Sequence, residues 1–255
     1  MTTRRRLLAL PLLLLAGCAT RVWDEGSEKP KLEFQNLGLN PRNGGVVATA
    51  QDLLPGDIIL SAANGINSMG VRLITLAPVS HASIYLGGGQ IAEAVGEGIR
   101  RRSVPELLAE ESTVVAFRHP AVQAHHLEKM DVFVRETVGQ RYNFVGIVLQ
   151  APFSIERRLC ELPLMPSLLR DFCVQGVGAV QLGMGPSDRF FCSQFVLEAY
   201  RRAGLPLTDA DPRLLSPADL LHMREGDVPS VRTHQTLQYV GHLKFEPPPA
   251  LIAVD

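Results

Sequence analysis

The stretch that decides the fold runs from Ser80 to Ala94 and reads SHASIYLGGGQIAEA. Its first half alternates polar and apolar residues, as strands do, and three consecutive glycines then mark a turn into a second strand. Period two places His81, Ser83 and Tyr85 on one face of the first strand. The stretch therefore predicts a β-hairpin with a histidine on one of its faces.

The length of the glycine loop decides whether Glu93 can reach His81. With a three-residue loop, Leu86 lies opposite Gln90 and Ser83 lies opposite Glu93, so the carboxylate shares the face of the imidazole at a diagonal position. A loop of two or four residues would move the carboxylate to the other face. Taken singly, each of these side chains is better explained as a solvated strand position.

Further strands surround this hairpin, so the sequence predicts a small antiparallel sheet. The turn Pro55-Gly56-Asp57 leads into an apolar strand at 58–60, and we expect Asp57 to bond the backbone of its turn. The other expected elements are strands at about 80–86, 90–95, 99–103, 113–118 and 236–245, and helices at 68–76, 121–138 and 192–203.

The helix at 192–203 begins with a cysteine. Phe195, Val196 and Ala199 recur at helical spacing, and Gly204 stands where a C-terminal cap belongs. A helix N-terminus favours the thiolate, which is the nucleophilic form of cysteine. The alternative for Cys192 alone is that it packs as a small buried residue, as most cysteines do.

The first residues predict export and lipidation. Arg4, Arg5 and Arg6 precede an apolar stretch at 7–15, which is the layout of a signal peptide and is too short to span a membrane. The sequence Leu-Ala-Gly-Cys ending at Cys18 resembles the bacterial lipobox, in which the cysteine is acylated after cleavage. Residues 1–17 are then the signal peptide. Alanine at the next position favours the outer membrane, facing the periplasm.

Composition and cysteine count limit the function classes. The 255 residues are 46% hydrophobic with a formal net charge of −1, so a nucleic-acid partner is not expected. Apart from Cys18 there are three cysteines, and in an oxidising compartment Cys160 and Cys173 are the pair available for a disulfide, which leaves Cys192 free. The cysteines lack metal-site spacing and the histidines are scattered, so we expect no metal site.

Four short motifs resemble the NlpC-type papain-like cysteine hydrolases. The run 81–87 (HASIYLG), with a polar residue twelve positions after its histidine, resembles their histidine strand, and 55–59 (PGDII) resembles their entry strand. The run 139–144 (GQRYNF) resembles their Gly-x-x-Tyr motif, and 191–196 (FCSQFV) their nucleophile helix. Histidine and glutamate precede the cysteine here, which resembles the circularly permuted YiiX/YebB-like branch.

The resemblance implies an α+β fold in which an antiparallel sheet packs against the helix that carries the nucleophile. It implies that Cys192 is the nucleophile, His81 the general base and then acid, and Glu93 the group that orients the imidazole. It also places Tyr142 over the nucleophile, where it binds the oxyanion together with the backbone N–H of Cys192. The reaction that the resemblance implies is acyl transfer through a thioester that water resolves, without cofactor or metal.

The domain boundaries follow from these motifs. A lipidated cysteine and flexible tether occupy 18–50, the hydrolase domain 51–246 and a tail 247–255. An insertion at about 145–187 is either a structural hairpin or an apolar lid beside the active site.

The substrate and the reaction stay open at this point. The substrate is a murein peptide according to the wider family, or a lipid or lipid-linked amide according to the permuted branch. The alternatives to hydrolysis are an inactive lipoprotein that uses the same cleft for binding or scaffolding, and acyl transfer to an acceptor other than water.

Overall fold

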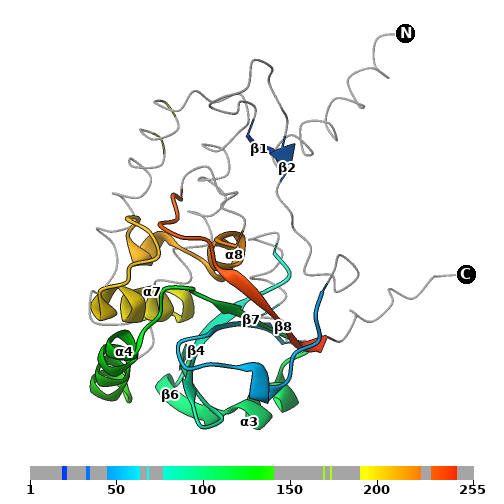
Figure 1. The fold of residues 1–255 in the computed structure, drawn as a ribbon, viewed down its shortest axis with the longest axis vertical. Coiled ribbons are helices and arrows are strands. Elements are labelled where there is room, and N and C mark those ends of the chain that lie inside the picture. Colours follow the sequence, from blue (N-terminus) through cyan, green and yellow to red (C-terminus); the bar gives the residue numbers. More distant parts are fainter. Residues whose placement is uncertain are drawn as a thin grey trace, which may run out of the picture.

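A computed structural model of the protein describes residues 19–21, 33–34, 45–63, 68, 77–140, 169, 173, 190–224 and 231–245. In these ranges the chain has an α+β fold, as predicted, built on a six-stranded antiparallel sheet (Figure 1). The sheet strands are β3 (Ile58–Ala62), β4 (His81–Gly87), β5 (Gln90–Val95), β6 (Gly98–Ser103), β7 (Thr113–Arg118) and β8 (Gln238–Phe245). Their order across the sheet is β6-β5-β4-β3-β7-β8.

The remaining elements are helices, two short 3-10 turns and a separate strand pair. The helices are α3 (Val104–Glu110), α4 (Ala124–Thr137), α7 (Cys192–Ala203) and α8 (Pro217–His222), and the 3-10 turns are η2 (Ala50–Asp52) and η3 (Pro212–Leu214). Strands β1 (Ala19–Arg21) and β2 (Glu33–Phe34) pair with each other. None of the helices in the described ranges has the length and apolar character needed to cross a membrane.

The β4–β5 hairpin reaches the predicted register through a different turn. Ser83 lies opposite Glu93, as predicted. The predicted opposition of Leu86 and Gln90 is wrong, because Gly87 pairs with Gln90 and the register shifts beside it. The loop is therefore two residues long, and a bulge next to it adds one unpaired residue. That extra residue restores the alternation, so the carboxylate keeps its predicted face.

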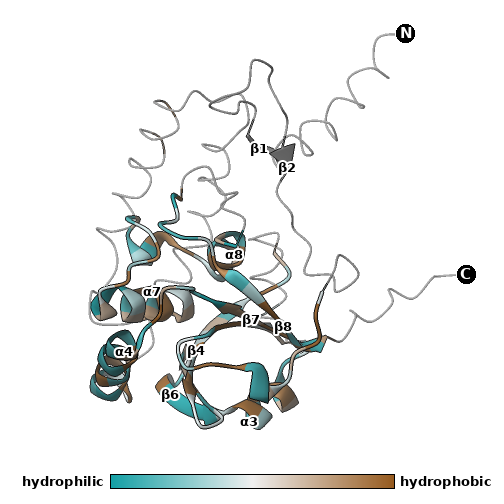
Figure 2. Ribbon diagram, viewed as in Figure 1, coloured by the Kyte–Doolittle hydropathy of each residue, from teal (hydrophilic) through white to brown (hydrophobic). Residues whose placement is uncertain are grey.

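The two faces of the sheet carry separate apolar clusters. Ile84 and Ala92 belong to the cluster that includes the buried residues of α4 and α7. Tyr85 and Ile91 belong to the other cluster, with Leu107 of α3. Both α4 and α7 carry hydrophilic and hydrophobic residues, as expected of amphipathic helices that pack on one side (Figure 2).

Helix α7 spans the predicted 192–203 and lies deep in the core. Phe195, Val196, Tyr200 and Ala203 have no exposed surface, because their spacing places them on the side that faces the sheet and α4. Gly204 ends the helix in the left-handed conformation, with φ 85°. The amphipathic pattern therefore fixes both the rotation of α7 and the position of its first residue.

The turn before β3 is held to α7 and to β7. The hydroxyl of Tyr200 donates a hydrogen bond to the carbonyl of Gly56. Asp57 accepts the backbone N–H of Leu54 at 2.8 Å, which confirms its expected role in the turn, and it also accepts two bonds from Arg118 at 2.7 Å. These contacts hold the start of β3 against α7.

Two helices were not predicted, although each has a sequence signal. Ser103 accepts the backbone N–H of Glu106 at the start of α3, and Ser216 accepts that of Asp219 at the start of α8. Both helices carry a proline in the first turn. A serine followed three residues later by an acidic residue, with proline between them, is a helix start. The helix expected at 121–138 begins later, at Ala124, and of the one expected at 68–76 only Ser68 is described, as helical.

Residues 46–48 run beside β8, the last strand of the sheet. The backbone N–H of Ala48 donates to the carbonyl of His242 at 2.9 Å, and the N–H of His242 donates to the carbonyl of Val46 at 2.8 Å. A Cβ atom at Gly241 would lie 2.6 Å from the Cβ of Ala48 and 2.9 Å from the carbonyl oxygen of Val46. Glycine is therefore required there for this segment to approach β8.

We expect Gly241→Ala to lower the free energy of unfolding by about 1–3 kcal/mol, because the added methyl group must push residues 46–48 away from β8. Gly88→Ala is the matched control, since Gly88 also has a positive φ, of 60°, but a Cβ there meets nothing within 4 Å. Its cost is the conformational strain alone, about 1 kcal/mol. Urea unfolding measures both, and equal losses for the two variants would contradict the close approach.

Candidate active site

Cys192 is the first residue of α7. Phe191 before it has an extended backbone, with φ −104° and ψ 169°, so the helix starts at the cysteine itself. The thiol is free and its residue is 5% exposed. The unpaired N–H groups and the positive end of the helix dipole lie at this position, and both favour a negative charge on sulfur.

His81 lies at the first position of β4, with a side chain that is 16% exposed. Its Nε2 atom is 2.9 Å from Oε2 of Glu93, within hydrogen-bond distance. Cys192 also acts on this ring, because the side chain and the charge of the cysteine raise the pKa of the imidazole. Because Glu93 occupies Nε2, we assign the contact with the thiol to Nδ1. The imidazole therefore lies between the thiol and the carboxylate.

The surroundings of His81 favour its charged form. Burial lowers the pKa of the imidazole, but the hydrogen bonds and negative charges of Cys192 and Glu93 outweigh burial and raise the pKa to about 10. At neutral pH the ring therefore holds two protons, one for each partner. An imidazolium beside a thiol stabilises the thiolate.

Glu93 has no exposed surface and is held by three cationic groups. Burial raises the pKa of its carboxyl, whereas the hydrogen bond and charge of His81 and the two arginines Arg100 and Arg102 lower it, and the pKa falls to about 2. The Nε atoms of Arg100 and Arg102 lie 2.9 and 2.8 Å from Oε1 of Glu93. Oε1 thus meets the arginines while Oε2 meets the histidine.

No role in the site was predicted from the sequence for Arg100 and Arg102. Both share the face of Glu93, because β6 pairs antiparallel with β5 and Arg100 lies directly opposite Glu93. Only Arg101 points the other way, to Asp131 on α4 at 2.9 Å. Period-two alternation along the run Arg100–Arg102 was the available signal, but it needed the β5–β6 register.

Glu111 is a second buried carboxylate near the site, and it had no signal in the sequence. Its residue is 8% exposed, and its Oε1 lies 3.6 Å from the guanidinium of Arg102. Burial raises the pKa of this carboxyl, and the charges of His81 and Arg102 oppose that rise. The carboxyl therefore interacts with both the imidazole and the guanidinium.

Other predicted site residues lie outside the described residues. These are Tyr142, Cys18 and Cys160. Cys173 is described and is disulfide-bonded, whereas Cys192 is a free thiol. The pairing of Cys173 with Cys160 stays a prediction.

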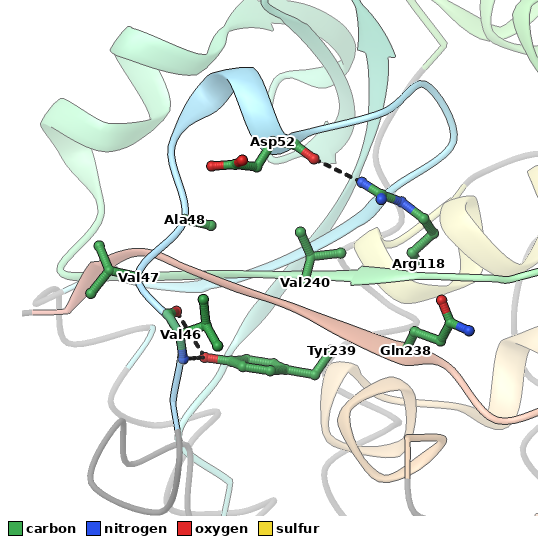
Figure 3. Close-up of a pocket in the computed structure, with 8 residues that line it drawn as sticks. All are labelled: Val46, Val47, Ala48, Asp52, Arg118, Gln238, Tyr239 and Val240. Carbon is green, nitrogen blue, oxygen red and sulfur yellow. Dashed lines mark hydrogen bonds between the residues drawn. The ribbon is translucent and has the colours of Figure 1, made fainter.

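A pocket of about 370 Å³ lies away from these groups, where residues 46–52 pass over β7 and β8 (Figure 3). Arg118, Asp52 and Tyr239 line it, but Cys192, His81 and Glu93 do not. Within the described part of the chain, no group of three or more His, Cys, Asp or Glu side chains is placed to hold a metal ion.

Comparison with known proteins gives one relative that matches over nearly the whole length of both chains. The chain is 35% identical over 252 residues to the probable lipoprotein peptidase YaeF of Escherichia coli K12, covering 94% of this chain and 92% of that protein. Among solved structures, the metalloprotein yiiX from Escherichia coli O157:H7 is similar with a TM-score of 0.43 and 17% identity, covering 77% of this chain and 99% of that one. No protein-family model matches the chain.

We expect the imidazole of His81 to titrate near pH 10 in NMR spectra of the wild-type protein. Cys192→Ala and Glu93→Gln should each lower that pKa by at least about one unit, because each removes a hydrogen bond and a negative charge from the ring. A wild-type His81 that titrates near its ordinary value of 6.5 would contradict the arrangement. The raised pKa also means that protonated His81 stabilises the fold fully below pH 6.5, and that this contribution is lost as the pH rises through 10.

Proposed function

The chain belongs to the family of the probable lipoprotein peptidase YaeF of Escherichia coli, and from this premise we propose that it is a lipid-anchored cysteine hydrolase that cleaves an amide or ester bond. That relative is named a probable peptidase, which supports hydrolysis. The observation that carries the cysteine chemistry is the position of His81, which contacts Glu93 at hydrogen-bond distance and whose pKa Cys192 raises.

The first half of the reaction forms a thioester. The thiolate of Cys192 attacks the carbonyl carbon of the substrate, and the carbonyl oxygen becomes an oxyanion. The protonated His81 then gives its proton to the leaving amine or alcohol as the bond to the carbonyl carbon breaks. A pKa near 10 for His81 supports this order, because the ring already holds that proton before substrate arrives.

The second half releases the acid. Neutral His81 takes a proton from water, and the hydroxide attacks the thioester. The sulfur leaves as a thiolate, which pairs again with the protonated ring. Glu93 stays ionised throughout, since its pKa lies near 2, and it keeps the ring in place. Every step uses protein groups and water, so the proposal requires no cofactor.

The oxyanion needs donors close to the sulfur. The backbone N–H of Cys192 is the first of α7, so helix geometry gives it no acceptor four residues earlier. We assign it as one donor, and the hydroxyl of Tyr142 as the other on the strength of the family resemblance.

Lipidation at Cys18 would hold the enzyme at the periplasmic side of the outer membrane. Two substrate classes lie within reach there: the peptide of murein, and a lipid or lipid-linked amide in the bilayer. A thioester also permits transfer to an acceptor other than water, so acyl transfer uses the same groups.

We expect iodoacetamide to alkylate Cys192 faster at pH 6 than it alkylates an exposed cysteine, because His81 and the helix start favour the thiolate. An exposed cysteine has a pKa near 8.5, and its rate rises about tenfold per pH unit between about pH 6 and 8. Mass spectrometry of the alkylated peptide measures both rates in the full mature protein. His81→Asn should slow the reaction at pH 6 by about tenfold or more, and Cys192→Ser should abolish labelling.

The same measurement separates an enzyme from a binding module. A Cys192 that reacts no faster at pH 6 than an exposed thiol would defeat the enzyme proposal and favour an inactive lipoprotein that uses this cleft for binding. Labelling of Cys173 is a further control, since a disulfide-bonded sulfur does not react with iodoacetamide.

We expect the full mature protein to release new products from either murein fragments or lipid extracts, detected by mass. Cys192→Ser should lower product formation by at least about a thousandfold, because it removes the nucleophile. Products from murein fragments would assign the peptide substrate, and products from lipid extracts the lipid-linked one. Equal activity of Cys192→Ser and wild type would exclude the proposed mechanism.

A further inference from the structure

Arg102 is a buried guanidinium that joins three carboxylates. Its side chain is 7% exposed and lies on the face of β6 that looks toward Glu93. Its Nε is 2.8 Å from Oε1 of Glu93, and its terminal nitrogens are 2.5 Å from Glu110 and 3.6 Å from Glu111. A buried cation needs such partners, and here one of them is the carboxylate that contacts His81.

Arg100 contacts the same oxygen of Glu93, Oε1, but its own side chain is more exposed to solvent. Its Nε lies 2.9 Å from Oε1 of Glu93, but its side chain is 39% exposed and also contacts the exposed Glu97 at 3.2 Å. Water and salt screen the charge of Arg100, whereas the charge of Arg102 is largely shielded from solvent. The chain thus offers a matched pair of arginines, one buried and one exposed, on a single carboxylate oxygen.

We propose that Arg102 is a positioning residue of the reaction, which clamps Oε1 of Glu93 so that Oε2 is directed at Nε2 of His81. The inference rests on the proposed function, because it assigns a role in orienting the imidazole that activates Cys192. The carboxylate has two equivalent oxygens and can rotate about its last bond. The Nε of Arg102 makes no hydrogen bond, so its guanidinium holds Oε1 as a close ion pair, while Nε of Arg100 donates a hydrogen bond to the same oxygen. A buried cation that is itself held by Glu110 and Glu111 opposes that rotation, because turning the carboxylate would separate the two charges.

The charges that face Glu93 come from three parts of the fold. His81 belongs to β4, Arg100 and Arg102 to β6, and Glu111 follows α3. If Arg102 loses its charge, Glu93 and Glu111 stay buried with Arg100 and His81 as the remaining cations. The carboxyl pKa of Glu93 must then rise from its value near 2, because a buried negative charge has lost its least screened partner.

The test compares Arg102→Gln, Arg102→Lys and Arg100→Gln in the full mature protein. The first readout is the carboxyl pKa of Glu93 from NMR with labelled glutamate. We expect a rise of about one unit or more in Arg102→Gln. The rise should be smaller in Arg100→Gln, and Arg102→Lys, which keeps the charge, should stay near wild type.

The second readout is the rate of Cys192 alkylation at pH 6. We expect a loss of about tenfold in Arg102→Gln and of less than about threefold in Arg100→Gln. Arg102→Lys should lose a few-fold despite its charge, since an ammonium lacks the planar fork that contacts several carboxylates at once. Thermal melting reports whether each variant folds.

The outcomes separate this inference from the proposed function. A fast wild-type Cys192 with an unchanged rate in Arg102→Gln overturns the positioning role and leaves the cysteine hydrolase intact, even if the melting temperature falls. If Arg102→Gln does not fold, Arg102→Lys decides, and a wild-type rate in that variant overturns the role. A wild-type Cys192 as slow as an exposed thiol overturns both proposals.

Discussion

The ion cluster around Glu93 is the interaction on which the site depends. A carboxylate without exposed surface loses its hydration, and the cost is several kcal/mol unless cations and hydrogen bonds replace the water. Here His81, Arg100 and Arg102 supply that replacement from two neighbouring strands. The cluster requires β4, β5 and β6 to hold one register, because a shift of one residue would turn these side chains to opposite faces.

The bulge beside the β4–β5 turn is what meets this requirement. A two-residue turn alone would place Glu93 on the wrong face, and the extra residue next to Gly87 corrects the alternation. Gly87 has φ 92°, a conformation that residues with a Cβ adopt at a cost, so the run of three glycines allows the bulge and the tight turn to follow each other. The glycine run therefore serves the geometry of the site as well as the chain reversal.

Packing of α7 supplies the other half of the site. Phe195, Val196 and Tyr200 hold the helix against the sheet and α4, and Cys192, its first residue, interacts with His81, the first residue of β4. The same packing leaves little exposed surface on the thiol. The sulfur atom of Cys192 is therefore buried by the core, placed at the start of a helix and set beside an imidazolium. These three features come from separate parts of the sequence.

Much of this arrangement was predictable, because it rests on local patterns. Alternation of polar and apolar residues predicted the strands around His81 and Glu93, and helical spacing ended by Gly204 predicted α7. The odd number of cysteines predicted that Cys192 is a free thiol. The short helices α3 and α8 were missed, although Ser103 and Ser216 begin recognisable caps. Their apolar stretches are too short to show a period, so only the caps marked them.

The sequence by itself determined the strands, the long helix and the residue types available for chemistry, since these depend on neighbours within a few positions. Only the tertiary structure decided that Arg100 and Arg102 neutralise Glu93, that Glu111 lies beside them and that a bulge sets the hairpin register. These features depend on which strands pair and on how much solvent they exclude. Burial and the final strand register are properties of the folded chain, and local patterns determine them only in part.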